Sequence, residues 1–208
     1  VKLKLTSIGS ASCTSDKAKD SIQVTFTAAP VPTPGSYGPV CANNAVITLN
    51  GSMTIATGGT WTSSSGCGSC FSANTTMSGS TYTPSAQDIT NGTVTLTLTS
   101  TGNGTCLASQ ATTTILINKA PTITSGADMV VCTTLNSVAL TSTPANNASV
   151  SWAVTTGTGT ITSASSANTS YNISATDKTN GVAILTVTAV GNPGCSNVTA
   201  QTMLSFTN

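Results

Sequence analysis

The residues of this chain best suited to chemistry are its seven cysteines, two of which stand together in the motif Cys67-Gly-Ser-Cys70. A Cys-x-x-Cys pair can act as a redox centre or supply half of a zinc site. A redox pair belongs at the start of a helix in a βαβ unit, and a zinc site needs two further ligands that this chain does not offer nearby. We therefore predict that Cys67 and Cys70 form a small structural disulfide.

The other residue types exclude most catalytic chemistry. The charged residues are six lysines and five aspartates, with no arginine, glutamate or histidine. Without histidine there is no ordinary catalytic triad, and the aspartates are scattered singly, whereas acid–base pairs and calcium sites need clustered carboxylates. The net charge of only +1 does not provide the basic stripe that binds nucleic acid. We predict a protein that is not an enzyme, with no cofactor, metal or nucleic-acid partner.

The remaining cysteines fall at equivalent positions of an internal repeat. Residues 1–13, 94–106 and 183–195 align without a gap, and each segment is an alternating strand followed by a turn that ends in a cysteine. The second and third copies also align at further residues, which are Cys41 with Cys132, Trp61 with Trp152, Tyr82 with Tyr171, and Asp88 with Asp177. Similarity at a period of about ninety residues is the signature of an array of modules.

The repeat predicts one disulfide in each complete module, Cys41 with Cys106 and Cys132 with Cys195. Cys13 is the equivalent of Cys106 and Cys195, so we expect it to be unpaired by truncation, with its partner in a part of its module before Val1. Paired cysteines at module spacing are typical of an oxidising, extracellular compartment.

Short alternating segments bounded by Gly, Asn, Ser and Pro predict β-strands packed as sandwiches. In the first complete module we expect strands at 45–53, 59–63, 79–83, 93–101 and 111–118. Proline-rich junctions divide the chain into the C-terminal part of a truncated module (1–30) and two complete modules (31–120 and 121–208). The predicted fold class is all-β, with modules that stand end to end as a rod.

Each complete module places a Trp between two Cys over a sandwich-sized segment, a pattern typical of immunoglobulin-like domains. The stretches Gly58-Gly-Thr-Trp61, Tyr82-Thr-Pro-Ser-Ala-Gln-Asp-Ile89 and Gly92-Thr-Val-Thr-Leu-Thr-Leu-Thr99, with the Gly-x-Cys that follows, resemble the tandem immunoglobulin-like or PKD-like repeats of very large bacterial surface adhesins of the SprB gliding-motility type. The resemblance implies a location at the cell surface. It also implies adjacent modules, surface polysaccharide or other cell-surface components as partners. The third module departs from the pattern around Trp152 and after Tyr171.

Several single residues could serve either a site or the fold. Trp61, Trp152, Tyr82 and Tyr171 could form sugar-stacking platforms, but they lie in strand-like segments, which favours core packing. Asp88 and Asp177 precede Asn-Gly, and we expect them to cap a turn by accepting hydrogen bonds from backbone N–H groups. Asp20-Ser21-Ile22 resembles a short bacterial O-glycosylation signal, which makes Ser21 a candidate modification site.

These observations favour a structural and adhesive protein, a stretch of a long extracellular stalk or filament whose modules act as spacers. Two alternatives stay open. A carbohydrate-binding or enzyme-accessory module would be favoured by an exposed row of aromatic residues on one sheet. A subunit of a polymeric filament would complete its partial module with a strand from a neighbour.

The partial module can be tested by amide hydrogen exchange. Residues 1–30 supply about two strands, and an isolated two-stranded hairpin is marginal in water because it cannot bury its apolar face. We expect a segment that precedes Val1 in the same chain to supply the covering sheet. In a verified monomer of the 208-residue chain, residues 1–30 should exchange quickly while residues 94–101 are protected. Strong protection of residues 1–30 would contradict this reading.

Overall fold

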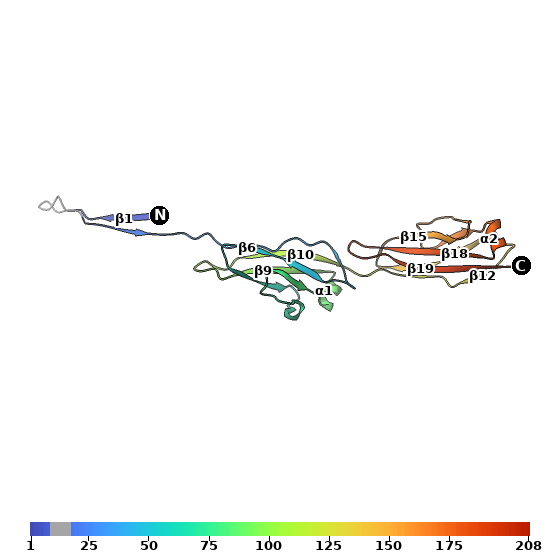
Figure 1. The fold of residues 1–208 in the computed structure, drawn as a ribbon, viewed down its shortest axis with the longest axis horizontal. Helices are drawn as coiled ribbons and strands as arrows, with labels where there is room; N and C mark the ends of the chain where they lie inside the picture. The colour runs from blue at the N-terminus through green and yellow to red at the C-terminus, as the bar shows by residue number, and fades with distance from the viewer. Residues whose placement is uncertain (9–17) are drawn as a thin grey trace.

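The computed structural model describes residues 1–8 and 18–208. Figure 1 shows an elongated arrangement in which an N-terminal hairpin is followed by two β-sandwiches that lie end to end, with the C-terminus at the far tip. Cys13 lies outside the described residues. Among the residues described, no helix combines the length and hydropathy needed to cross a membrane.

The first sandwich is built around a four-stranded sheet in the order β4-β10-β9-β7, while β5 pairs with β8 and β3 with β6. Its elements are β3 (Val31–Thr33), β4 (Val40–Cys41), β5 (Ile47–Asn50), β6 (Ser52–Thr54), β7 (Gly58–Ser63), η1 (Gly68–Cys70), β8 (Ser78–Tyr82), α1 (Ala86–Asn91), β9 (Thr93–Thr101) and β10 (Gln110–Asn118). The edge strand β4 runs parallel to β10, and the other pairs of this sheet are antiparallel.

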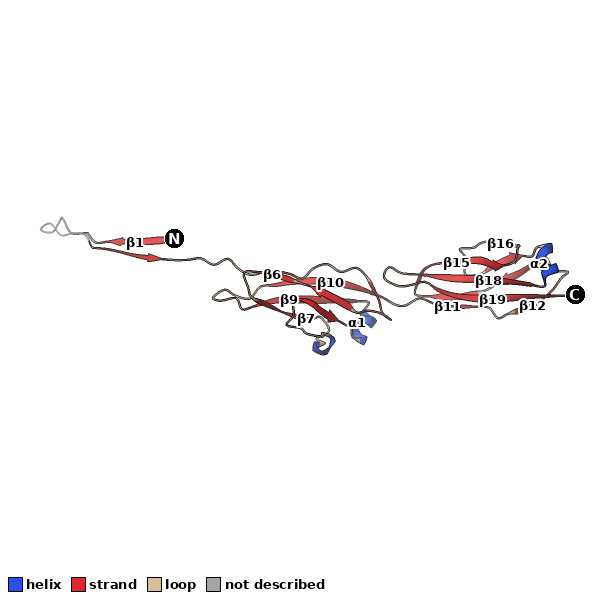
Figure 2. Cartoon of the chain, in the orientation of Figure 1, coloured by secondary structure: helices blue, strands red, loops and turns tan. Residues whose placement is uncertain are grey.

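The second sandwich repeats this topology, with a sheet in the order β12-β19-β18-β15 (Figure 2), except that β16 joins the pair of β13 and β17 as a third strand. Its elements are β11 (Thr122–Ser125), β12 (Met129–Cys132), β13 (Ser137–Leu140), β14 (Ser142–Ala145), β15 (Asn147–Thr156), β16 (Thr160–Ile161), β17 (Thr169–Asn172), α2 (Ala175–Asn180), β18 (Val182–Gly191) and β19 (Val198–Thr207). The edge strand β12 is again parallel to its neighbour, β19. The two sandwiches are therefore copies of one immunoglobulin-like fold, as the repeat and the Cys-Trp-Cys pattern predicted.

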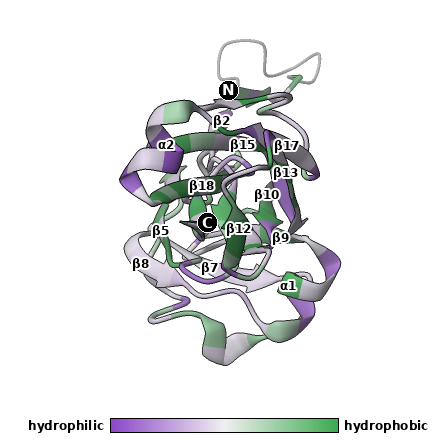
Figure 3. Ribbon diagram, turned by 90° about the vertical axis from the view of Figure 1, so that its right-hand side faces the viewer, coloured by the Kyte–Doolittle hydropathy of each residue, from purple (hydrophilic) through white to green (hydrophobic). Residues whose placement is uncertain are grey.

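Each sandwich has its own core, formed by alternate residues of its strands. In β9 the side chains of Leu96 and Leu98 are buried while the threonines between and beside them are more exposed, and β18 repeats the pattern with Leu185 and Val187. In Figure 3, β12 and β18 are coloured mainly as hydrophobic. The first core holds Trp61 and the second holds Trp152, and the two buried clusters share no residue.

The structure differs from the predicted elements at two kinds of place. The expected strand at 45–53 is divided at Gly51, because β5 pairs with β8 whereas β6 pairs with β3. A Cβ at Gly51 would lie 2.6 Å from the Trp61 ring, so glycine lets the indole pack against the backbone there. The short helices α1 and α2 replace what we expected to be turns, because six residues are too few to show a helical period.

The N-terminal hairpin pairs β1 (Lys2–Thr6) with β2 (Lys19–Gln23) in antiparallel register. Every residue of both strands is exposed, including the apolar ones. Leu5 of β1 is 75% exposed, Ile22 of β2 is 64% exposed and Phe26, just beyond β2, is 77% exposed, which are unusual values for side chains of this size. In the described residues this hairpin is therefore a ribbon without a covering sheet, and its assignment to a truncated module remains a prediction.

The separate cores predict that a cavity in one sandwich leaves the other intact. Leu185 is fully buried, so Leu185→Ala should lower the free energy of unfolding of the second sandwich by about 2–5 kcal/mol. Because each core contains a single tryptophan, denaturation followed by fluorescence in Trp61→Phe and Trp152→Phe backgrounds reports the two sandwiches separately. Leu107→Ala is the control, because Leu107 is 90% exposed and its loss should cost under about 0.5 kcal/mol. An equal shift of both transitions would show one cooperative core.

Candidate functional site

The most distinctive site lies where the two sandwiches meet, and it is built around a disulfide between them. Cys41 ends the edge strand β4, where it lies opposite Asn118 at the end of β10. Cys195 lies in the turn that joins β18 to β19 in the other sandwich. The two cysteines are bonded, with their Cα atoms 4.8 Å apart. The bond joins one repeat to the next.

This disulfide overturns the predicted pairings of Cys41 with Cys106 and of Cys132 with Cys195. Within the first sandwich, Cys41 is level with the end of β10, whereas Cys106 lies in the turn that precedes β10. A nine-residue strand separates these levels by about 30 Å, far beyond the roughly 7 Å between Cα atoms that a disulfide tolerates. The same separation applies to Cys132 and Cys195. An edge-strand cysteine and a turn cysteine therefore meet across a junction and not inside a module.

The turn that carries Cys195 is fitted to the end of the first sandwich. Gly194 has a φ of 87°, and a Cβ at this position would lie 2.4 Å from the carbonyl oxygen of Pro39. Both facts require glycine. The side-chain amide of Asn118 donates a hydrogen bond of 2.8 Å to the Pro193 carbonyl oxygen. The turn is thus bound covalently and by a hydrogen bond to the preceding module.

The linker between the sandwiches has little freedom. Only residues 119–121 separate β10 from β11. The Cys195 sulfur lies 3.7 Å from the Asn118 carbonyl oxygen and 3.6 Å from that of Lys119. On the other side, the Asn146 amide donates to the carbonyl oxygen of Ala120 at 3.2 Å. The linker between the sandwiches is therefore short, and both the Cys195 turn and the Asn146 side chain contact it.

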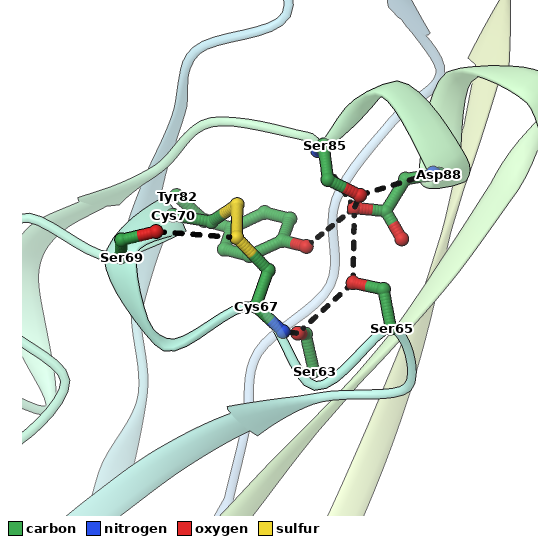
Figure 4. Close-up of a disulfide and its surroundings, with 8 residues drawn as sticks. All are labelled: Ser63, Ser65, Cys67, Ser69, Cys70, Tyr82, Ser85 and Asp88. Carbon is green, nitrogen blue, oxygen red and sulfur yellow. Dashed lines mark hydrogen bonds between the residues drawn. A yellow bond between two sulfur atoms is a disulfide. The ribbon is translucent and has the colours of Figure 1, made fainter.

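Cys67 and Cys70 form a disulfide with each other, which is the predicted pairing. Figure 4 shows this bond beside a chain of hydroxyl groups that leads to Asp88. The Cys67 N–H donates to Ser63 Oγ at 3.2 Å, and Ser65 Oγ donates to Asp88 at 3.3 Å. The Cys70 carbonyl oxygen accepts a hydrogen bond from the Thr83 N–H, just beyond β8. These contacts suit a structural staple that holds the loop between β7 and β8 in place.

The two aspartates predicted to cap turns do so at the first turn of α1 and of α2. Asp88 accepts hydrogen bonds from the Ser85 N–H at 2.8 Å and from the buried Tyr82 hydroxyl at 2.7 Å. Asp177 repeats these contacts with Ser174 and Tyr171. Each aspartate and its serine form a reciprocal capping box, in which both side chains accept from the partner's backbone N–H.

These contacts shift the pKa values of the groups involved. Burial alone would raise the pKa of Asp177, but hydrogen bonds from the Thr158 and Ser174 N–H groups and from Tyr171 outweigh it and hold this pKa below its usual value. The pKa of Asp88 is lowered in the same way, against the effect of burial, by hydrogen bonds from Tyr82 and Ser85. Burial, followed by the hydrogen bond to Asp177, raises the pKa of Tyr171 to about 12. Both carboxylates are thus ionised at neutral pH. Each accepts several hydrogen bonds from its own sandwich, so its role is structural.

The aromatic candidates are also part of the fold. Trp61, Tyr82 and Tyr171 are fully buried, and Trp152 is 3% exposed. They therefore form no sugar-stacking platform in this structure. Ser21 is exposed in β2, and its modification remains a prediction. Within residues 1–8 and 18–208, no group of three or more metal-ligating side chains occurs.

The comparisons with known proteins concern the fold. No protein-family model and no curated protein matches the chain. Among solved structures, it is similar to Sidekick-1 immunoglobulin domains 1–5, with a TM-score of 0.53 and 16% identity over 88% of this chain and 40% of that one. It is also similar to the three immunoglobulin domains I67–I69 of titin, in an E-to-A variant, with a TM-score of 0.50 and 14% identity over 92% of this chain and 70% of that one. The chain thus has the fold of tandem immunoglobulin domains and spans less than half of the Sidekick-1 fragment.

The buried Tyr171–Asp177 pair predicts a pH-dependent stability. Tyr171→Phe removes one donor from a buried carboxylate, so it should lower the free energy of unfolding of the second sandwich by about 1–3 kcal/mol at pH 7. An unfolded tyrosine has its ordinary pKa of about 10. Because the folded pKa is raised to about 12, the contribution of Tyr171 is complete below pH 10 and is lost as the pH rises towards 12.

The difference in stability between the wild type and Tyr171→Phe should therefore narrow above pH 10, as measured by denaturation followed through Trp152. The other tyrosines titrate in both proteins and cancel. The first sandwich, followed through Trp61, should be unaffected by the substitution. A difference that stays constant up to pH 12 would contradict the assignment.

Proposed function

We propose that this chain is a structural and adhesive segment of a long extracellular stalk, in which immunoglobulin-like modules act as spacers at the cell surface. The observation that carries the proposal is the bonded junction between the two sandwiches. Three linker residues, a closely fitted turn and the Cys41–Cys195 disulfide fix one module on the end of the next. A binding module that must adapt to a ligand gains nothing from this construction, whereas a spacer depends on it.

The disulfides support an extracellular location. Cys41–Cys195 and Cys67–Cys70 are both structural, and such bonds persist in oxidising compartments. The division into a truncated module (1–30) and complete modules (31–120 and 121–208) belongs to the proposal, as do adjacent modules and cell-surface polysaccharide as partners. The resemblance to SprB-type gliding-motility adhesins suggests a bacterial surface, on which an exposed Ser21 would be accessible to glycosylation.

The two alternatives draw less support. A carbohydrate-binding module would use exposed aromatic rings, but the tryptophans and two of the three tyrosines are buried in the cores. A strand-complemented filament subunit is consistent with the exposed hairpin β1–β2. It does not account for the disulfide between the sandwiches, because strand exchange needs no covalent bond at that place.

Small-angle X-ray scattering tests the spacer role. The wild-type chain should scatter as one elongated particle with a narrow distribution of long distances. Cys41→Ser with Cys195→Ser removes the bond at the junction, so this variant should broaden that distribution while both sandwiches stay folded. Cys67→Ser with Cys70→Ser is the matched control, because it removes a disulfide inside one sandwich and should leave the long distances unchanged. A compact wild-type particle would refute the spacer role.

A further inference from the structure

Two cysteines of the described residues, Cys106 and Cys132, carry no disulfide. They are the repeat equivalents of Cys195 and Cys41, which are bonded to each other. Cys106 lies in the turn between β9 and β10, as Cys195 lies in the turn between β18 and β19. Cys132 ends the edge strand β12, as Cys41 ends β4. One turn cysteine, Cys106, and one edge-strand cysteine, Cys132, are thus without a disulfide, and they lie in different sandwiches.

The surroundings of Cys106 reproduce those of Cys195. The Cys106 thiol lies 3.9 Å from the Thr27 carbonyl oxygen and 3.7 Å from that of Ala28. At the bonded junction, the Cys195 sulfur lies 3.7 Å from the Asn118 carbonyl oxygen and 3.6 Å from that of Lys119. Thr27 and Ala28 come after β2 in the same way as Asn118 and Lys119 come at the end of β10. The incoming linker therefore already runs beside the Cys106 thiol, in the position that it takes at the bonded junction.

The turns themselves differ in sequence but deliver the cysteine in the same way. Asn192-Pro-Gly-Cys195 and Asn103-Gly-Thr-Cys106 are both closed by a hydrogen bond from the cysteine N–H to the asparagine carbonyl oxygen, at 2.8 and 3.1 Å. The left-handed glycine is the third residue in the first turn and the second residue in the other. The cysteine is thus the fourth residue of a closed turn in both cases.

The surroundings of Cys132 reproduce those of Cys41. Cys132 lies opposite Thr207 in the parallel pair β12–β19, and Cys41 lies opposite Asn118 in the pair β4–β10. The next residue of each donates its N–H to that opposite residue, Thr133 to Thr207 at 2.9 Å and Ala42 to Asn118 at 2.8 Å. Cys132 is exposed, and hydrogen bonds from Thr134 lower the pKa of its thiol. The Cys132 thiol is therefore accessible from solvent.

We propose that Cys106 and Cys132 are each one half of a further disulfide between modules, so that the turn cysteine of every module is bonded to the edge-strand cysteine of the module before it. Cys132 would take the turn cysteine of a following module, and Cys106 the edge-strand cysteine of the module that contains β1 and β2. The partners are modules of the same chain, because the linker that reaches Cys106 comes from β2 itself. A module of another chain would have to displace that linker. The inference rests on the proposed array and adds a covalent bond at each of its junctions.

The bond forms by thiol–disulfide exchange with a disulfide oxidant, such as oxidised glutathione or a disulfide oxidoreductase. The Cys132 thiolate attacks the oxidant disulfide and releases one of its thiols. The thiolate of the partner cysteine then attacks the mixed disulfide and releases the second thiol. The two electrons pass to the oxidant, which is reduced to two thiols that take up the two protons lost by the cysteines.

A tandem protein tests the proposal, with residues 1–208 followed directly by a second copy of residues 29–208. This fusion places Thr207 and Asn208 where Thr27 and Ala28 stand before the first sandwich, so Cys132 of the first copy should meet Cys106 of the second. Cys106→Ser in the first copy and Cys132→Ser in the second leave one cysteine of each kind. After refolding in a glutathione redox buffer, mass spectrometry of unreduced peptides should find Cys132 bonded to Cys106. Alkylation of Cys132 by iodoacetamide should fall at least tenfold relative to the single-copy chain.

The Cys41–Cys195 bond in each copy reports that the tandem protein has folded and formed its junctions. The matched control carries Cys106→Ser in both copies, and its Cys132 should be as reactive as in the single-copy chain. A reactive Cys132 in a tandem whose two Cys41–Cys195 bonds are intact would overturn the proposal, as would a bond from Cys132 to Cys13 or to a second molecule. Scattering separates this failure from failure of the spacer role, because an elongated tandem without the new bond refutes the covalent link alone.

Discussion

The whole structure depends on the alternation of buried, mainly apolar side chains with more exposed side chains, many of them threonine, in the central strands. In β9 and β18, Leu96, Leu98, Leu185 and Val187 point into the cores, and the threonines between them cover the sheet surface. The chain has few charges, and threonine hydroxyls make polar contacts on that surface, as in the pair of Thr95 and Thr114 across β9 and β10. Burial of the apolar face stabilises each sandwich, and the threonine-rich outer face stays in contact with solvent.

The two buried carboxylates, Asp88 and Asp177, occur at one recurring place, where the chain passes from β8 to β9 and from β17 to β18. There a tyrosine hydroxyl, an aspartate and a serine satisfy one another at the start of α1 and of α2. A buried carboxylate without these donors would cost several kcal/mol, so the three residues form a unit that must be kept together. The loop between β7 and β8 is free to differ between the copies, and only the first copy fixes it with a disulfide.

Much of this could be predicted from the sequence, because local patterns determine it. The alternation identified β9 with its full bounds, the repeat identified the buried tryptophans and tyrosines, and the spacing before Asn-Gly identified the capping aspartates. The predicted pairing of Cys41 with Cys106 was wrong for a physical reason. An alignment of repeats identifies which kinds of cysteine are equivalent, but it does not say which copy supplies the partner. That depends on whether the two lie at the same end of a strand, and a nine-residue strand separates Cys41 from Cys106.

The disulfide between the sandwiches also determines how the molecule carries tension. When the chain is pulled by its two ends, the load passes from Cys41 through the sulfur bridge to Cys195 and bypasses the backbone between them. Without the bridge, the chain between Cys41 and Cys195, a sequence separation of 154 residues, would extend on unfolding to about 500 Å at roughly 3.3 Å per residue. With the bridge intact, that length is locked, and both folds could melt without lengthening this part of the tether. Between Cys41 and Cys195, the length of the tether thus depends on the redox state of one bond and not on the thermodynamic stability of the modules.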